Sequence, residues 1–207
     1  YEILIGLVGS EMCIRDSIIS TYKKGTDFSI YMDTDGLIHA GSGLDQVTWM
    51  DVRVGDWVAT PRHGKPVEIN ALWYNALCTM DMLQAKFGDN DDSYRQLASL
   101  VKTSFNKRFW NENTGCLYDV VDEDDDTIRP NQIYAVSLPF TMPDMEREKA
   151  IVDTVMDKLY VGCGLRSLDP DHKDYHPIYI GSLSKRDHAY HQGTAWGFLL
   201  GGFISAY

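Results

Sequence analysis

The stretch PVEINALWYNALCTMDMLQAKF, residues 66–87, decides the fold class of this sequence. Its apolar residues recur every three or four positions, which is the spacing that places side chains on one face of an α-helix. Pro66 suits the first position of such a helix, and Gly88 suits the position just after its end. The stripe that predicts this helix consists of Ile69, Leu72, Trp73, Ala76, Met80, Leu83 and Phe87.

Four more segments on the C-terminal side of this stretch carry helical patterns. Apolar spacing predicts helices over residues 93–109 and 143–159, a shorter helix within 129–138 and a last helix from about Ala189 to Tyr207. Long loops separate these segments, and the sequence shows neither strand–helix–strand alternation nor an internal repeat. We therefore predict an all-α domain in which helices pack in pairs with long loops on one side, as in an α/α toroid.

Turn residues dominate the segment that precedes residue 65. Clusters of glycine, aspartate and serine over residues 18–64 predict loops rather than helices. Within them DTDGLIHAG, residues 33–41, is typical of a short β-hairpin. A second small hairpin is predicted at residues 116–121. The acidic run at 122–126 lacks the glycine and the spaced ligands of a calcium loop, so we interpret it as a solvated loop.

Both ends of the sequence look foreign or cut. LVGSEMCIRDS, residues 7–17, resembles a translated sequencing-library adapter, so residues 1–17 are interpreted as a non-native leader. At the other end WGFLLGGFISAY, residues 196–207, is an apolar helical run with no cap or stop signal. We expect residues 18–207 to be one domain fragment, truncated at both ends, of a longer protein.

Charge and cysteine content restrict the partners of the chain. The formal net charge is −11, which argues against binding to nucleic acid or to an anionic membrane, because both are polyanions. No apolar run approaches the length of a transmembrane helix. The four cysteines are not spaced as metal ligands, so we predict a reduced, cytoplasmic protein without a metal or other cofactor.

Several long motifs resemble one known family. They are YKKGTDFSIYMDTDGLIHAG at 22–41, TWMDVRVGDWVATPRHGKPVEINALWYNAL at 48–77, RPNQIYAVSLPF at 129–140, GLRSL at 164–168 and RDHAYHQGTAWGFLLGGFISAY at 186–207. Together they are similar to the C-terminal glucosidase domain of glycogen debranching enzymes, the amylo-α-1,6-glucosidase family. The resemblance implies a six-hairpin (α/α)6 barrel, of which this chain holds a part, and a glycogen-type α-glucan as substrate. It also implies hydrolysis of α-1,6 branch linkages in glycogen catabolism.

The resemblance assigns the general acid to Asp51 in TWMD. An inverting glycosidase needs one carboxylic acid that protonates the leaving oxygen and a second carboxylate that activates water, about 6.5–9.5 Å away. The acid needs a site that disfavours its charge, and Trp49 and Met50 are expected to provide one. Taken on spacing alone, Asp51 reads instead as a loop aspartate that caps a turn.

The second carboxylate is not expected within this sequence. In the family it is a glutamate beyond the helix that follows HQGT, and the sequence ends at Tyr207 inside that helix. Glu68 lies one turn into a predicted helix, where a substrate-binding or helix-dipole role is more natural than that of a base. We therefore predict that the chain by itself is inactive.

The predicted sugar pocket combines polar and aromatic side chains that suit sugar hydroxyls and ring faces. Four parts of this pocket have a structural alternative: a salt-bridged loop at Arg62, core packing at Trp73, capping of the helix within 129–138 and a structural role for His191. The predicted substrate-binding residues are Trp49, Arg62, Lys65, Glu68, Asn70, Trp73, Arg129, Asn131, Gln132, His191, Gln192 and Trp196.

Two other functions remain open from the sequence. The first is a non-catalytic carbohydrate-binding α/α module, in which the same cleft only holds glucan. The second is a glucoamylase-like or trehalase-like hydrolase that acts on another α-glucoside. A glutamate beyond Tyr207 would favour hydrolysis over binding, and the choice of substrate would separate the two hydrolases.

Overall fold

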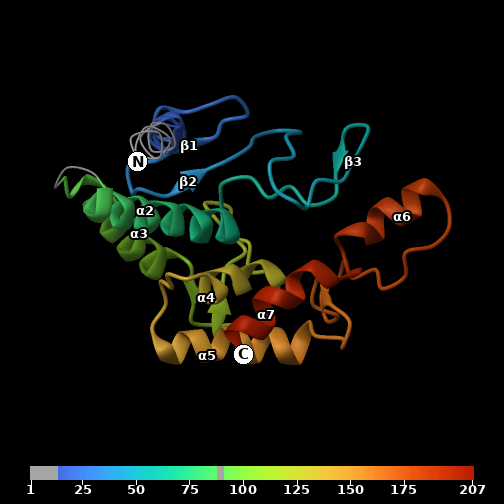
Figure 1. Cartoon of the computed structure of the whole chain (residues 1–207). Coiled ribbons are helices and arrows are strands. Elements are labelled where there is room, and N and C mark those ends of the chain that lie inside the picture. The colour runs from blue at the N-terminus through green and yellow to red at the C-terminus, as the bar shows by residue number, and fades with distance from the viewer. Residues whose placement is uncertain (1–13, 88–90) are drawn as a thin grey trace, which may run out of the picture.

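The computed structural model describes residues 14–87 and 91–207 and is mostly helical (Figure 1). Three long helices form its body: α2 (Val67–Phe87), α3 (Ser93–Arg108) and α5 (Met145–Lys158). Two shorter helices lie between α3 and α5, η1 (Pro130–Ile133) and α4 (Tyr134–Ser137), and three more follow α5, namely α6 (Leu183–Tyr190), η2 (Gly197–Leu199) and α7 (Leu200–Ala206). The predicted all-α class agrees with this content, and the long helices lie where apolar spacing predicts them.

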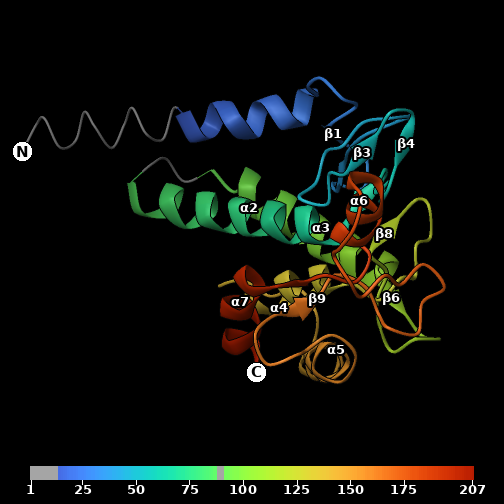
Figure 2. The same cartoon turned by 90° about the vertical axis from the view of Figure 1, so that its right-hand side faces the viewer.

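Helices α2 and α3 pack side by side and carry much of the apolar core (Figure 2). The predicted stripe of α2 is only partly correct, because Trp73 and Met80 are buried while Leu72 and Phe87 are exposed. The most deeply buried apolar side chains of the pair are Val67, Ala71, Leu77, Val101 and Phe105. Burial of these side chains against each other, rather than helix propensity alone, stabilises the pair.

In the described residues the segments outside the helices form five two-stranded antiparallel ladders. They pair β1 (Tyr31–Met32) with β2 (Ile38–His39), β3 (Arg53–Val54) with β4 (Trp57–Val58), β5 (Lys65–Pro66) with β8 (Val120–Val121), β6 (Trp110–Asn111) with β7 (Cys116–Leu117), and β9 (Leu165–Arg166) with β10 (Ala195–Trp196). The hairpin predicted at residues 33–41 is therefore confirmed by β1 and β2.

The hairpin predicted at residues 116–121 is wrong. Strand β7 pairs backwards with β6 across a turn at Gly115, whose φ of +68° suits glycine. Strand β8 instead pairs with β5, and the main-chain oxygen of Asp119 accepts a hydrogen bond from the Val67 N–H at 3.0 Å. Neither of the two residues between β7 and β8 has the positive φ that a two-residue hairpin turn requires.

The prediction of loops throughout residues 18–64 is wrong at its start. Residues 14–24 are helical, and this helix lies against α2, where Tyr22 meets Trp73 with ring centroids 6.3 Å apart. Ile19 on the same helix is buried. The expected stop at Gly88 and most of the expected leader lie outside the described residues.

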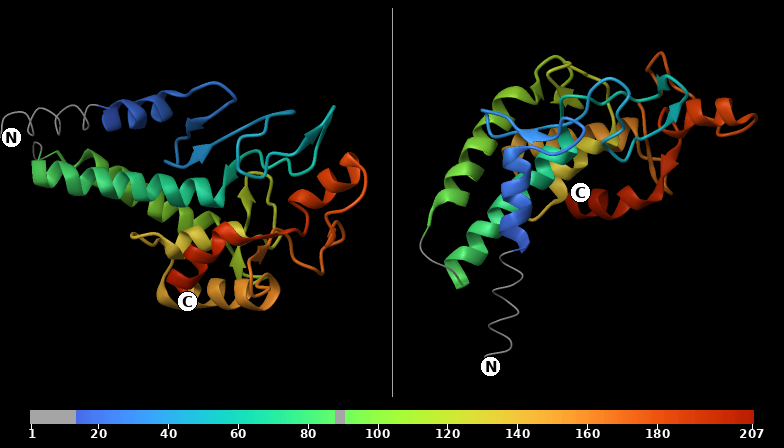
Figure 3. Two further views of the ribbon diagram at one scale, coloured as in Figure 1. Left: turned by 45° about the vertical axis from the view of Figure 1, so that its right-hand side comes forward. Right: turned by 90° about the horizontal axis from the view of Figure 1, so that it is seen from above.

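The continuous helix predicted from Ala189 to Tyr207 is also wrong. Helix α6 ends at Tyr190, the chain becomes extended in β10, and helical structure resumes only at η2 and α7. Gly193 has a φ of +146°, which interrupts any helix at that point. Figure 3 shows α6 beside the β3–β4 hairpin, apart from the α2–α3 body.

Nothing in the described part of the chain is a helix both long and apolar enough to cross a membrane.

Candidate active site

Asp51 lies in the loop that joins β2 to β3. The loop is held next to this residue, because Met50 is buried and its main-chain oxygen accepts a hydrogen bond from the Thr60 hydroxyl at 2.8 Å. The Asp51 side chain itself is 63% exposed. The apolar enclosure expected around this carboxyl is therefore not formed by the described residues, and the group faces solvent on an anchored backbone.

His191 is the side chain that stands behind Asp51. Its Nε2 lies 3.6 Å from Oδ1 of Asp51, and its side chain is only 1% exposed. The imidazole stacks on Trp196, with centroids 5.4 Å apart and planes at 23°, and meets Trp49 edge-on at 5.1 Å. Burial lowers the pKa of His191 to about 4, although the Asp51 carboxylate favours its charged form. At neutral pH the ring is uncharged.

Aromatic rings surround this pair on one side. Trp49 meets Trp196 and Phe198 edge-on, with centroids 5.6 and 5.1 Å away, and Phe198 is 56% exposed. Tyr190 packs against both His191 and Trp196. An exposed carboxylate beside aromatic faces suits a ligand that presents both hydroxyl groups and apolar ring faces.

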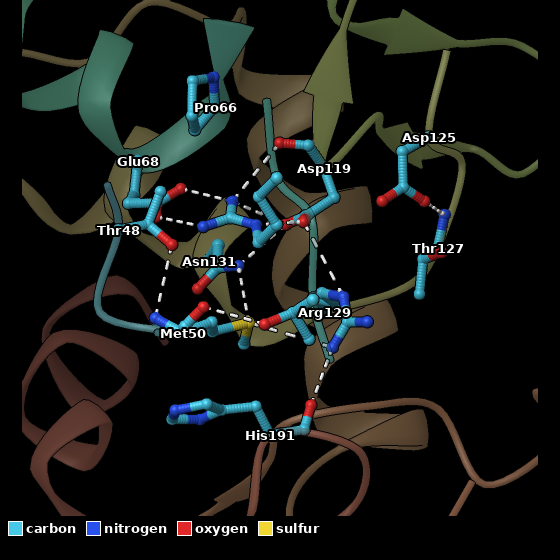
Figure 4. Close-up of polar contacts among 12 residues, drawn as sticks. Thr48, Met50, Pro66, Glu68, Asp119, Asp125, Thr127, Arg129, Asn131 and His191 are labelled. Carbon is cyan, nitrogen blue, oxygen red and sulfur yellow. Dashed lines mark hydrogen bonds and ion pairs between the residues drawn. The ribbon is translucent and has the colours of Figure 1, made fainter. Parts of the chain in front are cut away.

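A buried network of four charges underlies the site (Figure 4). The Arg62 guanidinium donates to both oxygens of Glu68, with Nη2 to Oε2 at 2.6 Å, and from Nε to Oδ2 of Asp119 at 2.5 Å. Asp119 also accepts from Nδ2 of Asn131 at 2.8 Å, and its Oδ2 lies 3.7 Å from Nε of Arg129. Two cations and two anions balance, which is the condition under which buried charges are tolerated.

The network changes the proton affinity of its arginines in opposite directions. Burial alone lowers the pKa of Arg62, but the adjacent Asp119 and Glu68 carboxylates outweigh it and raise that pKa above its usual value. Burial lowers the pKa of Arg129 from its usual value, and the more distant Asp119 only partly offsets it. Arg62 is thus a permanently charged centre of the network.

Arg129 connects this network to the segment that carries His191. Its Nη1 donates to the main-chain oxygens of Ser167 at 3.0 Å and His191 at 2.9 Å, and its Nη2 donates to Oε1 of Gln192 at 2.8 Å. Gln192 in turn donates to the Ala59 oxygen at 3.2 Å. The residues after β4 and after α6 are therefore joined through the Gln192 amide, which the Arg129 guanidinium holds.

Five of the predicted sugar ligands thus lie under the site rather than on its surface. They are Arg62, Glu68, Arg129, Asn131 and Gln192, all buried and hydrogen-bonded to other protein groups. The salt-bridged alternative for Arg62 describes what the structure shows. Of the predicted pocket, the structure brings Trp49, His191 and Trp196 next to Asp51.

The remaining predicted residues serve other parts of the fold. Nζ of Lys65 binds Asp33 and Asp35 at 2.8 and 2.9 Å, and Asn70 bonds the main chain of Ile38 through both its amide atoms. Trp73 donates to the Gly36 oxygen at 3.0 Å, and Gln132 accepts from the Leu117 N–H at 3.3 Å. Within the described residues none of the four bonds to Asp51 or His191. Lys65 fixes the turn of the β1–β2 hairpin to β5, and Asn70 and Trp73 fix the hairpin to α2.

Sequence reasoning missed three residues of this region: Asp119, Tyr190 and Phe198. Asp119 sits between the buried residues Leu117 and Val120, and a lone acid inside an apolar run was a usable signal of a buried charge. Phe198 was hidden by the wrong prediction of a continuous helix. No three His, Cys, Asp or Glu side chains gather as a metal site in the described parts of the chain.

Comparison with known proteins then places the chain. The model of the amylo-alpha-1,6-glucosidase family matches residues 7–207. The chain belongs to this family. The chain is also 29% identical, over 233 aligned residues, to a glycogen debranching enzyme from Saccharomyces cerevisiae. That alignment covers 89% of the chain but 15% of the yeast enzyme, so the chain spans less than a sixth of its relative. The family prediction made from the motifs is confirmed.

Proposed function

We propose that this chain is part of a glycoside hydrolase that cleaves α-1,6 branch linkages of glycogen-type glucans, with Asp51 as its general acid. The observation that carries the proposal is the exposed Asp51 carboxyl, backed by the buried His191 and flanked by the rings of Trp49 and Trp196. Membership in the amylo-α-1,6-glucosidase family supports the substrate class. The name of the yeast relative supports the branched glucan.

The proposed mechanism is inverting and uses two carboxyl groups. Asp51 gives its proton to the glycosidic oxygen while water attacks the anomeric carbon from the opposite face. Neither Glu68 nor Asp119 suits the role of base, because both are buried and bound by Arg62. The proposal therefore places the base, as the family resemblance does, in residues that follow Tyr207 in the complete enzyme.

The same proposal covers the architecture and the setting of the reaction. The helices described here would be part of an (α/α)6 barrel, completed by the rest of the enzyme. The missing turns of that barrel would cover apolar side chains that are exposed in this chain, such as Ile204 and Tyr207. The proposed setting is the cytoplasm, as expected from the cysteine content of the sequence.

Substrate choice tests the proposed bond. The full-length protein that carries this chain is incubated separately with a branched limit dextrin, a linear maltooligosaccharide and trehalose, and released glucose is measured. Release from the limit dextrin supports the proposal. Release from the linear substrate alone would assign a glucoamylase-like activity, and release from trehalose alone a trehalase-like one.

Binding without hydrolysis is a second candidate for the chain alone. It is favoured by the engagement of Glu68 and Asp119 with Arg62, which leaves neither of these two carboxylates free to activate water. Titration of the chain with isomaltose, followed by tryptophan fluorescence, tests it through Trp49 and Trp196. Saturable quenching without glucose release supports a binding role, and no response at millimolar sugar contradicts it.

A further inference from the structure

We infer that His191 is the positioning residue of Asp51: its Nε2–H donates to one carboxyl oxygen, so that the other oxygen carries the proton to the sugar. The inference deepens the proposed function and rests on it. It also changes the role predicted for His191, from a sugar ligand to a partner of the acid.

The first argument is the hydrogen-bonding state of the imidazole. Both ring nitrogens of His191 are buried, and neither has a hydrogen-bond partner among the described residues. Buried polar groups are nearly always paired, so an unpaired one calls for a function. The carboxyl of Asp51 is the acidic group recorded within ion-pair distance, 3.6 Å from Nε2. A shortening by about 0.6–0.9 Å would make an ordinary N–H···O hydrogen bond.

The second argument is that one partner is fixed and the other is free. His191 is held by the stack on Trp196, by the edge of Trp49 and by Arg129, which binds its main-chain oxygen. Asp51 is mostly exposed and has rotamers to explore. A fixed donor therefore selects the orientation of the exposed carboxyl, as an orienting group does for a catalytic side chain.

The third argument concerns the charge of the imidazole. The groups that face His191 are the Asp51 carboxylate, the Arg129 and Arg62 guanidinium groups and the Tyr190 ring. Burial and the two arginines keep the ring neutral at physiological pH, against the attraction of Asp51. A neutral ring donates one hydrogen bond and places no positive charge beside the acid, whereas an imidazolium would place one there.

The proton balance of the step follows from this arrangement. Oδ1 of Asp51 accepts from His191 and Oδ2 holds the acidic proton. That proton passes to the glycosidic oxygen, which takes the electron pair of the breaking carbon–oxygen bond, while a water oxygen bonds to the anomeric carbon. His191 keeps its own proton throughout, so it orients the acid and exchanges nothing with the substrate.

The pairing is tested on this chain without substrate. Nitrogen-15 NMR follows the His191 ring from pH 8 to pH 3 in the wild type, in Asp51→Asn and in Asp187→Asn, the last removing a carboxylate of α6 that is not paired with His191. We expect the neutral ring of the wild type to carry its proton on Nε2. We expect the pKa of His191 to be lower than in the wild type in Asp51→Asn and unchanged in Asp187→Asn. A proton on Nδ1, or the same pKa in all three proteins, would overturn the inference. Asp51 is exposed, so its variant is expected to fold.

Kinetics of the full-length enzyme provide the second readout. His191→Gln retains an N–H near the place of Nε2, whereas His191→Phe fills the space without a donor. We expect kcat to fall about 100-fold in His191→Phe and less than about 10-fold in His191→Gln, with KM changed little in either. Equal loss in both variants would assign His191 a packing role only. Paired NMR behaviour without glucose release would reject the proposed hydrolase and leave the pairing intact.

Discussion

The indole N–H of Trp49 donates a hydrogen bond of 2.7 Å to Oδ1 of Asn131, which lies 82 residues further along the chain. Asn131 passes this connection on, because its Nδ2 donates to Asp119 inside the buried charge network. Trp49 lies two residues before Asp51. The hydrogen bond therefore joins the loop of the proposed acid to the charge network close to the acid. Disturbance of the network is therefore expected to move Asp51.

Removal of the indole donor should destabilise the protein. Trp49→Phe keeps an aromatic ring but leaves Oδ1 of Asn131 buried without its partner, at a cost of about 1–3 kcal/mol in the free energy of unfolding. Trp57→Phe is the matched control, because Trp57 stacks on His188 and its indole forms no hydrogen bond among the described residues. Urea unfolding of both variants measures the difference. Equal stability of the two would show that the Trp49 bond contributes nothing.

Loss of one charge from the buried network should be severe. Asp119→Asn leaves Arg62, Arg129 and Glu68 with a net charge of +1 in a site that excludes water. We expect a loss of about 3–5 kcal/mol in the free energy of unfolding. Asp153→Asn breaks an exposed ion pair with Lys149 and should change stability by less than about 1 kcal/mol. A mild effect of Asp119→Asn would mean that the network is not a stabilising unit.

Acidification should destabilise the folded state through His191. Its pKa is about 4 in the folded protein against 6.5 for the free side chain, so only the unfolded chain binds this proton as the pH falls from about 6.5 to 4. The contribution of the neutral ring is complete above pH 6.5 and is lost towards pH 4, by up to about 3 kcal/mol. Urea unfolding across this range should show a shallower pH dependence in His191→Gln than in the wild type. Identical slopes would contradict the depressed pKa.

The backbone at Gly193 should not accept a side chain. A Cβ at this position would lie 2.6 Å from the main-chain oxygen of His176, and φ is +146°. Gly193→Ala should therefore lose about 2 kcal/mol or more of stability and displace the neighbouring His191. Gly115→Ala is the control, since φ there is +68° but nothing lies within 4 Å of the added Cβ. Thermal unfolding compares them, and the smaller loss is expected at Gly115.

Substrates with different leaving groups separate the contribution of proton donation by Asp51 from other effects on turnover. Asp51→Asn in the full-length enzyme should lower turnover of a branched limit dextrin by about 10²–10⁴-fold. Fluoride leaves without protonation, so turnover of α-glucosyl fluoride should fall far less. Asp56→Asn, on the exposed turn of the β3–β4 hairpin, serves as the control and should behave as wild type. Near-normal turnover of the dextrin by Asp51→Asn would remove this residue from the acid role.

Local patterns in the sequence predict much of the fold. The apolar spacing of residues 66–87 and 143–159 identifies α2 and α5, because residues three and four positions apart share one face of a helix. Asp144, at the start of the predicted segment 143–159, caps α5 by accepting a hydrogen bond from the Arg147 N–H. The hairpin at residues 33–41 follows from turn residues in the same way. Each of these features depends on contacts between residues that are close along the chain.

The rest of the site depends on contacts that no local pattern contains. The pairing of Arg62 with Asp119 spans 57 residues, and side-chain chemistry alone assigned Arg62 to the substrate, with a salt bridge as the alternative. The segment from Ala189 onward has the apolar spacing of a helix, yet β10 is extended because it pairs with β9. Motif similarity identified Asp51 and His191 as site residues, but their mutual placement required the fold.

The long reach of these bonds has a consequence for the order in which the protein folds. Gln192 binds the Ala59 oxygen across 133 residues, whereas α2 and α3 are neighbours in the chain. Closing long loops costs more chain entropy than pairing adjacent helices, and such contacts form late and open early. Amide hydrogens around Met50 and Gly193 should therefore exchange with deuterium sooner than those of α2. We therefore expect the α2–α3 pair to form first and the contacts that hold the loops of Asp51 and His191 to form last.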